Sequence, residues 1–156
     1  MKHSNLAIIA LCVFFSVQTS NAQERKFGLG VMIGEPTGFS AKLWTSNSNA
    51  FDFGLGWSVI NKYNYSGDRI HLHVDYLWHS FNAISSSERF PLYYGIGGRF
   101  KGGGNEGSFA VRGVLGIAWM PRQTPIDIFL EVAPSLELTP STGFAIDAAI
   151  GARYYF

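Results

Sequence analysis

The sequence predicts an all-β protein, an eight-stranded antiparallel up-and-down β-barrel that spans a membrane. Bulky apolar residues alternate with small or polar ones in stretches of about ten residues, and clusters of Gly, Pro, Asn, Ser and Asp separate these stretches. Only 15% of the residues are charged, against roughly 25% in an average soluble domain. After the N-terminal segment, no apolar run approaches the roughly 20 residues of a membrane-spanning helix.

Residues 1–22 are typical of a cleaved secretory signal peptide. Lys2 supplies the positive start, residues 6–17 form an apolar stretch that is too short to anchor, and Ala22 ends a small-x-small cleavage site. We therefore expect residues 23–156 to be the mature barrel. The only cysteine, Cys12, lies inside the predicted signal, so the exported chain is expected to contain no disulfide.

The first four strands are predicted where bulky apolar residues recur at every second position. The expected spans are 26–34, 37–45, 50–59 and 69–79. A tight turn containing Glu35 and Pro36 separates the first two spans, and Ser-, Asn- and Gly-containing segments separate the others.

The last four strands follow from the same alternation. The expected spans are 92–101, 108–119, 126–138 and 143–156. Pro134 occupies one of the alternate strand positions that are expected to face outward. Because proline cannot donate a ladder hydrogen bond, a bulge or local bend is expected there.

The sizes of the alternating residues predict which face meets lipid. One face carries bulky apolar residues, and the other carries Gly, Ala and charged residues. A soluble ligand-binding barrel would show long polar side chains on its outside instead. In a membrane barrel the bulky face meets lipid, and an eight-stranded interior has room only for side chains. The predicted lumen charge network is Lys42, Asp52, Arg69, His71, His73, Asp75, Arg99, Lys101, Arg112, Asp127, Glu131, Glu137, Asp147 and Arg153.

These lumen residues include six basic and six acidic side chains besides the two histidines, so complete pairing is expected. Aromatic residues on the outward parity fall near the two ends of the predicted strands, as expected where rings lie at lipid headgroups. The predicted girdles are Phe27, Phe51, Trp57, Trp78, Phe100, Phe109, Trp119, Phe144, Tyr154 and Phe156.

Two features of the sequence resemble a known family. One is the series of eight amphipathic stretches after a signal peptide, and the other is the C-terminus. The chain resembles the small bacterial outer-membrane barrels of the OmpA and OmpX kind over the whole predicted mature region. Gly151, Tyr154 and Phe156 match the family's C-terminal assembly signal, whereas Ala149 stands where a polar residue is usual. The resemblance implies location in the bacterial outer membrane, contact with outer-membrane lipid, and help from periplasmic chaperones and the outer-membrane assembly machinery.

The sequence favours a plugged or very narrow lumen and a structural or surface-interaction role, whose extracellular protein or small-molecule ligand it does not identify. A narrow pore for ions or small molecules is the alternative, and a lipid-modifying enzyme that uses His71 or His73 is a third. Basic and acidic residues are nearly balanced, 12 against 11, so no nucleic-acid partner is expected.

His71, His73 and Asp75 share one face of a predicted strand and could in principle bind a metal or act in acid-base catalysis. Same-face neighbours lie about 7 Å apart, which is awkward for ligating one ion. We therefore expect no metal, no cofactor and no catalytic residue. The glycine-rich segment at 102–107 fits a hairpin loop, because a strand rather than a helix is expected after it.

Overall fold

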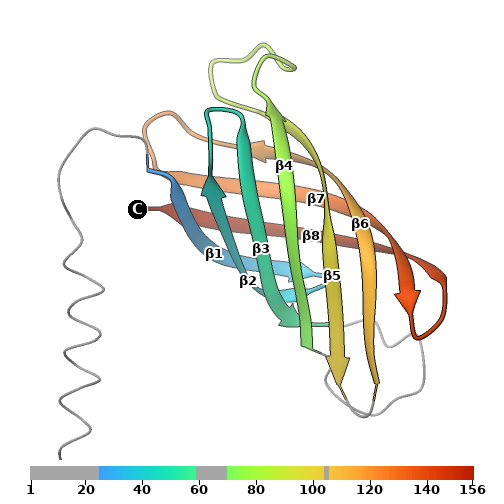
Figure 1. Cartoon of the computed structure of the whole chain (residues 1–156). Helices are drawn as coiled ribbons and strands as arrows, with labels where there is room; N and C mark the ends of the chain where they lie inside the picture. Colours follow the sequence, from blue (N-terminus) through green and yellow to red (C-terminus); the bar gives the residue numbers. More distant parts are fainter. Residues whose placement is uncertain (1–24, 59–69, 104–105) are drawn as a thin grey trace, which may run out of the picture.

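The protein is a closed, eight-stranded antiparallel barrel, seen here in a computed structural model that describes residues 25–58, 70–103 and 106–156. Each strand pairs with the next one in the chain, and β8 pairs with β1 (Figure 1). The closed, eight-stranded antiparallel barrel predicted from the sequence is therefore confirmed. Residues 1–22, the predicted signal peptide, and Arg69 lie outside the described residues. The strands are β1 (Phe27–Gly34), β2 (Thr37–Trp44), β3 (Asn49–Trp57), β4 (Ile70–Ser80), β5 (Leu92–Gly103), β6 (Glu106–Trp119), β7 (Ile126–Thr139) and β8 (Gly143–Tyr155).

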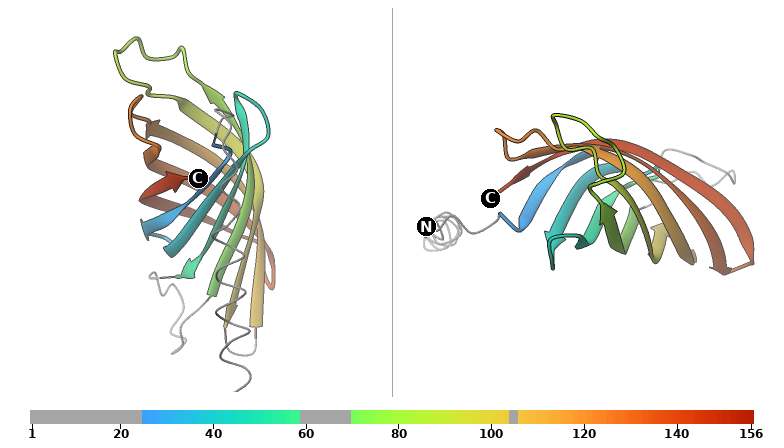
Figure 2. Two further views of the ribbon diagram at one scale, coloured as in Figure 1. Left: turned by 90° about the vertical axis from the view of Figure 1, so that its left-hand side faces the viewer. Right: turned by 90° about the horizontal axis from the view of Figure 1, so that it is seen from above.

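The alternation in the sequence is expressed as alternating exposure along the strands. In β4, for example, Leu72 and Val74 are exposed, while His71, His73 and Asp75, which alternate with them, are buried. Successive side chains of a strand point to opposite faces, so one set lines the lumen and the other covers the outside. Figure 2 shows the sheet curving continuously from β1 to β8. None of the described residues forms a helix that is long and apolar enough to cross a membrane.

The barrel has two distinguishable ends. The start of β1 and the end of β8 lie together (Figure 1), where Phe156 N donates to Phe27 O at 3.0 Å. We call this the terminal end; it also carries the β2–β3, β4–β5 and β6–β7 connections. The other end, here called the opposite end, carries the β1–β2 turn and the β7–β8 turn.

The irregularity expected at Pro134 lies a few residues away. Pro134 pairs in register with Ile146 of β8, while the register of β6 with β7 shifts between Phe109 and Ala110. The ladder pairs of β6 with β7 are interrupted between Arg112 and Leu115, which is opposite Pro134. The missing N–H of proline thus coincides with a gap in one ladder and adds no residue. The bulge expected at Pro134 was therefore wrong, and the alternative of a local bend stays a prediction.

The lumen holds a small apolar cluster that the sequence analysis did not assign. Its larger members are Met32, Leu77, Tyr93, Val114 and Phe129, all nearly inaccessible. Tyr93 shares the parity of the inward Gly95 and Phe129 that of Glu131, so alternation contained the signal. The interior is therefore filled by aromatic and apolar groups as well as by glycine, alanine and charge.

Candidate functional site

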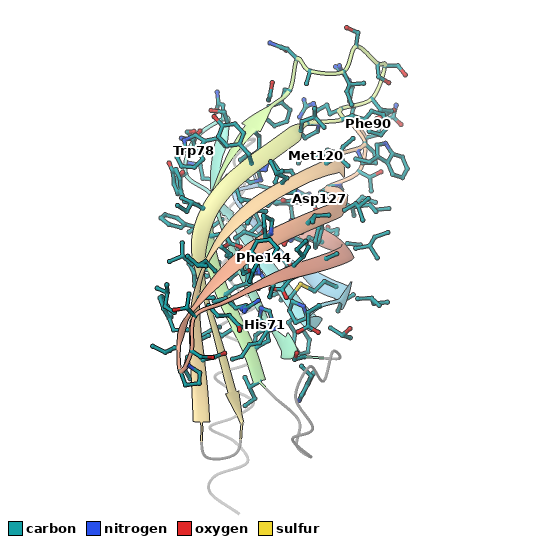
Figure 3. All side chains as sticks on the ribbon, turned by 90° about the vertical axis from the view of Figure 1, so that its right-hand side faces the viewer. His71, Trp78, Phe90, Met120, Asp127 and Phe144 are labelled. Carbon is teal, nitrogen blue, oxygen red and sulfur yellow. The ribbon has the colours of Figure 1, made fainter. Side chains whose placement is uncertain are left out.

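The charged lumen is the candidate functional site, because it gathers the chemically versatile side chains of seven strands, β2 to β8. Twelve of the predicted lumen residues are buried, and Glu137 is half-buried at the opposite end. Arg69 falls outside the part of the chain that the structure describes. The side chains of His71 and Asp127 point into the barrel, whereas Trp78 lies on the outside of the barrel (Figure 3).

At the opposite end, ion pairs run across the lumen from the β1–β2 turn to β8. Lys101 Nζ lies 2.7 Å from Glu35 Oε1 and 3.5 Å from Asp147 Oδ1. Arg99 joins the same carboxylate, with Nη1 2.6 Å from Asp147 Oδ2, and its Nη2 lies 2.7 Å from Glu137 Oε1. Each basic side chain thus contacts two carboxylates, which offsets the desolvation of buried charge.

Glu35 is a lumen residue that sequence reasoning missed, since it was expected in an exposed tight turn. Its side chain folds into the barrel mouth and is 4% exposed. Burial raises the pKa of Glu35, but the side chains of His71, Lys101 and Ser58 stabilise the carboxylate more strongly, so its pKa lies well below its ordinary value of 4.5. Only proximity in the folded barrel could reveal this role, because these three partners are distant in sequence.

Toward the terminal end, Arg153 organises a second set of contacts. Its Nη2 lies 2.7 Å from Asp52 Oδ1, its Nη1 lies 3.3 Å from Asp127 Oδ2, and its Nε donates to Ser40 Oγ at 2.7 Å. The hydroxyl of Tyr155 also donates to Asp127, at 2.7 Å. The guanidinium carbon lies 3.8 Å from the centre of the Phe129 ring, a cation–π contact.

His79 lies inside the lumen near the terminal end and not at a solvated rim. The side chain is buried, with Nε2 3.3 Å from Lys42 Nζ and Nδ1 3.1 Å from Ser48 O. The rings of Trp44 and Tyr93 lie against it, with centroids 4.4 and 5.1 Å away. Aromatic rings therefore pack around His79 inside the lumen near the terminal end.

The middle of the lumen joins the two sets of contacts. Arg112 Nη2 donates to Glu131 Oε1 at 3.0 Å, and its Nε lies 3.3 Å from Asp75 Oδ1. Tyr93 donates to the other oxygen of Glu131 at 3.2 Å. His73 lies beside Asp75 and, through its Nδ1, 3.3 Å from His71 Nε2. The polar groups therefore form a nearly continuous network along the barrel axis.

The residues predicted to form aromatic girdles lie on the outside, near the two ends of the strands. At the terminal end, Phe51, Tyr76, Trp78 and Tyr94 form consecutive ring contacts across β3, β4 and β5, with centroids 4.9 to 5.6 Å apart. At the opposite end, Phe100 and Phe109 are register partners on β5 and β6. The outer surface between these ends is predominantly apolar.

The three residues of the predicted assembly signal have different surroundings. Tyr154 and Phe156 are exposed and contact one another edge to face, with centroids 5.1 Å apart. Gly151 points inward, where a Cβ atom would lie 2.5 Å from Phe129 Cζ. Glycine is thus required at this position by packing inside the barrel.

A wide open hollow of about 1240 Å³ lies at the terminal end. Its lining includes the basic side chains of Arg25, Lys26, Arg89 and Arg122, and the acidic side chain of Glu88. Arg122 is itself held by the β4–β5 connection, because its Nε donates to Ser87 O at 2.9 Å. Trp44 and Tyr155 are among the aromatic residues that line the hollow.

Comparison of the chain with models of protein families, with curated proteins and with solved structures gives no significant match. The OmpA and OmpX resemblance therefore stays a prediction from the sequence.

Proposed function

We propose that the protein is an integral barrel of a bacterial outer membrane, with a closed lumen and a structural or surface-interaction role. The observation that carries the proposal is the reversal of the usual arrangement of a soluble protein. Large apolar side chains are exposed on every strand, while charged side chains fill the interior. In lipid, only a closed barrel or a helix satisfies all backbone hydrogen bonds, and this sheet has no open edge.

The closed lumen follows from the burial of its charges. Side chains that line a water-filled channel are accessible to water, yet Lys42, Arg99, Arg112 and Asp127 are nearly inaccessible. Paired side chains and the aromatic cluster occupy the axis instead. This packing favours a plugged scaffold over the alternative of a narrow pore.

A lipid-modifying activity has less support from the geometry. His71 and His73, the two candidate histidines, face the lumen and are almost completely buried. A lipid acyl chain on the outside of the barrel would not reach either ring.

Two measurements on the chain reconstituted in lipid test the proposal. For orientation, a spin label at Leu72→Cys should be accessible to a lipid-soluble relaxation agent, and one at Ala149→Cys should be protected, both in a Cys12→Ser background. The reverse result would overturn the membrane assignment. For the lumen, the protein in a planar bilayer should give no current steps. Discrete ohmic steps would contradict the closed lumen and support the narrow pore.

A further inference from the structure

Three potential metal ligands converge in the middle of the lumen from two neighbouring strands. Asp52 of β3 and Asp75 of β4 are register partners, and His73 lies two residues before Asp75. His73 Nε2 lies 4.0 Å from Asp52 Oδ2 and 3.9 Å from Asp75 Oδ2, and one donor atom from each of the three residues lies within 4.8 Å of the others. The neighbouring strand supplies one ligand and the side chains bend toward one another, so the spacing of about 7 Å along a single strand does not keep the three ligand atoms apart.

Two of the three ligand atoms that face this point lack hydrogen-bond partners. Among the residues that the structure describes, neither His73 Nε2 nor Asp75 Oδ2 has a hydrogen-bond partner, although both side chains are only 1% exposed. An orphaned buried polar atom costs free energy. Two such atoms directed at the same point indicate that something positively charged belongs between them.

The contacts of His71 indicate which ring nitrogen of His73 carries no proton. His71 Nδ1 faces Glu35 Oε1 at 3.7 Å, and His71 Nε2 lies 3.3 Å from His73 Nδ1. This contact with Glu35 is longer than a hydrogen bond, but the negative charge of the carboxylate favours a proton on the facing nitrogen. We therefore assign the proton of His71 to Nδ1, which leaves its Nε2 to accept from His73 Nδ1–H. His73 Nε2 is then unprotonated and faces two carboxylates, an arrangement that is repulsive without a cation.

The second oxygens of both carboxylates form ion pairs outside the cluster, although these contacts lack hydrogen-bond geometry. Arg153 Nη2 lies 2.7 Å from Asp52 Oδ1, and Arg112 Nε lies 3.3 Å from Asp75 Oδ1. The two arginines therefore orient Oδ2 of each carboxylate toward His73. Such outer contacts are how proteins fix metal ligands, as is the hydrogen bond between a ligating histidine and a neighbouring group.

The charge of the lumen also leaves room for a cation. Among its described residues, seven carboxylates, including Glu35 and the half-buried Glu137, accompany five lysine and arginine side chains. With neutral histidines this is an excess of two negative charges, with Arg69 outside the described residues. A divalent ion would balance that excess.

We propose that Asp52, His73 and Asp75 bind a divalent transition-metal ion, with zinc as the representative. A cation at the centre of three atoms with these spacings would lie roughly 2.3 to 2.5 Å from each atom, somewhat farther than the bonds of about 2.0 to 2.2 Å that zinc makes to nitrogen and oxygen. The three side chains would therefore move slightly inward when zinc binds. The imidazole favours zinc and its transition-metal neighbours over calcium or magnesium. Because the site is enclosed, the ion enters while the barrel folds, and its role is to join β3 to β4 inside the lumen.

The test is retention of zinc by the untagged full chain, refolded in detergent with zinc chloride and then dialysed into metal-free buffer. We expect elemental analysis to find about one zinc per chain, as for a single site with three protein ligands. Asp75→Asn and His73→Gln should each weaken zinc binding at least on the order of 100-fold, beyond the roughly 10- to 100-fold effect of outer-shell changes. Glu137→Gln is the matched control, because it removes a lumen carboxylate that lies outside the cluster, and it should retain zinc. Different migration of boiled and unboiled samples in detergent gels checks that each variant is folded.

Two results would overturn the proposal: a folded wild-type chain that retains no zinc, or ligand variants that retain as much as wild type. X-ray absorption of the zinc-loaded wild-type chain covers the case in which the variants do not fold. One imidazole and oxygen ligands around zinc support the site, and a spectrum without imidazole contradicts it. If instead a proton on Asp75 replaces the metal, the infrared band of a protonated carboxyl group persists after refolding with zinc, which also rejects the proposal.

Discussion

Arg99 of β5 and Asp147 of β8 contact each other directly across the lumen, with Arg99 Nη1 2.6 Å from Asp147 Oδ2. Their strands are not hydrogen-bonded neighbours, so the ion pair links two parts of the wall that the β-sheet ladder does not join directly. Both side chains are buried, and the pair is surrounded by protein rather than solvent. Such a contact resists flattening of the barrel.

The first prediction concerns the coupling between these two side chains. Asp147→Asn should destabilise the barrel by about 3–5 kcal/mol, because it leaves Arg99 and Lys101 short of a buried partner. In a double-mutant cycle with Arg99→Gln, the coupling free energy should be at least about 1 kcal/mol. Denaturant unfolding from lipid vesicles measures both quantities. Additive effects of the two substitutions would show that the cross-lumen pair does not contribute, and Arg99→Gln with the distant Glu88→Gln is the additive control.

The second prediction concerns Glu35 and pH. Because its pKa in the folded barrel lies below the ordinary value of 4.5, the folded state favours the carboxylate more than the unfolded state does. The resulting stabilisation is present above pH 4.5 and decreases as the pH falls below it. Glu35→Gln should therefore lower the free energy of unfolding at pH 7 and reduce its dependence on pH in the acid range.

Glu88→Gln is the control for Glu35, because Glu88 lies half-buried on the β4–β5 connection at the terminal end, far from Glu35. It should change the free energy of unfolding by no more than about 0.5 kcal/mol. Equal acid sensitivity of the wild type and of Glu35→Gln would mean that the contacts of Glu35 with Lys101 and His71 do not stabilise the fold.

The third prediction tests the apolar outer face. Val132 lies near the middle of β7 and is 43% exposed, so the proposed membrane position places it in hydrocarbon. Val132→Arg should destabilise the barrel in lipid vesicles by about 2–4 kcal/mol. Ile84→Arg introduces the same charge at a residue that is 38% exposed but lies between β4 and β5, and its effect should be within about 0.5 kcal/mol. Similar small effects of both substitutions would argue against a lipid-facing wall.

The fourth prediction concerns the space that Gly54 leaves for His73. A Cβ atom on Gly54 would lie 2.1 Å from His73 Cε1 and 2.7 Å from Met32 Cε. Gly54→Ala should therefore destabilise the barrel by about 1–3 kcal/mol through overpacking. Gly113→Ala is the control, since its Cβ would meet only Pro134 Cγ, at 3.9 Å. If thermal unfolding gave equal losses for the two variants, the close packing of the His73 ring would not be the cause.

Much of the barrel was predictable from local pattern. The alternation that assigned Leu72 outward and His73 inward requires only that a strand has a period of two residues. The bounds of β2 and β7 differ from expectation by a residue at most, because Gly, Pro and Ser clusters mark the turns. The same parity would have assigned Tyr93 and Phe129 inward, had size not been used to select the lumen residues.

The sequence by itself determined the strands, their number, and which side chains share a face, because these depend on neighbours along one strand. The tertiary structure alone decided which lumen side chains meet. Closure of the barrel brings Glu35 to Lys101 and Arg153 to both Asp52 and Asp127. These contacts depend on the relative register and tilt of strands far apart in the chain, and a two-residue period contains no information about either.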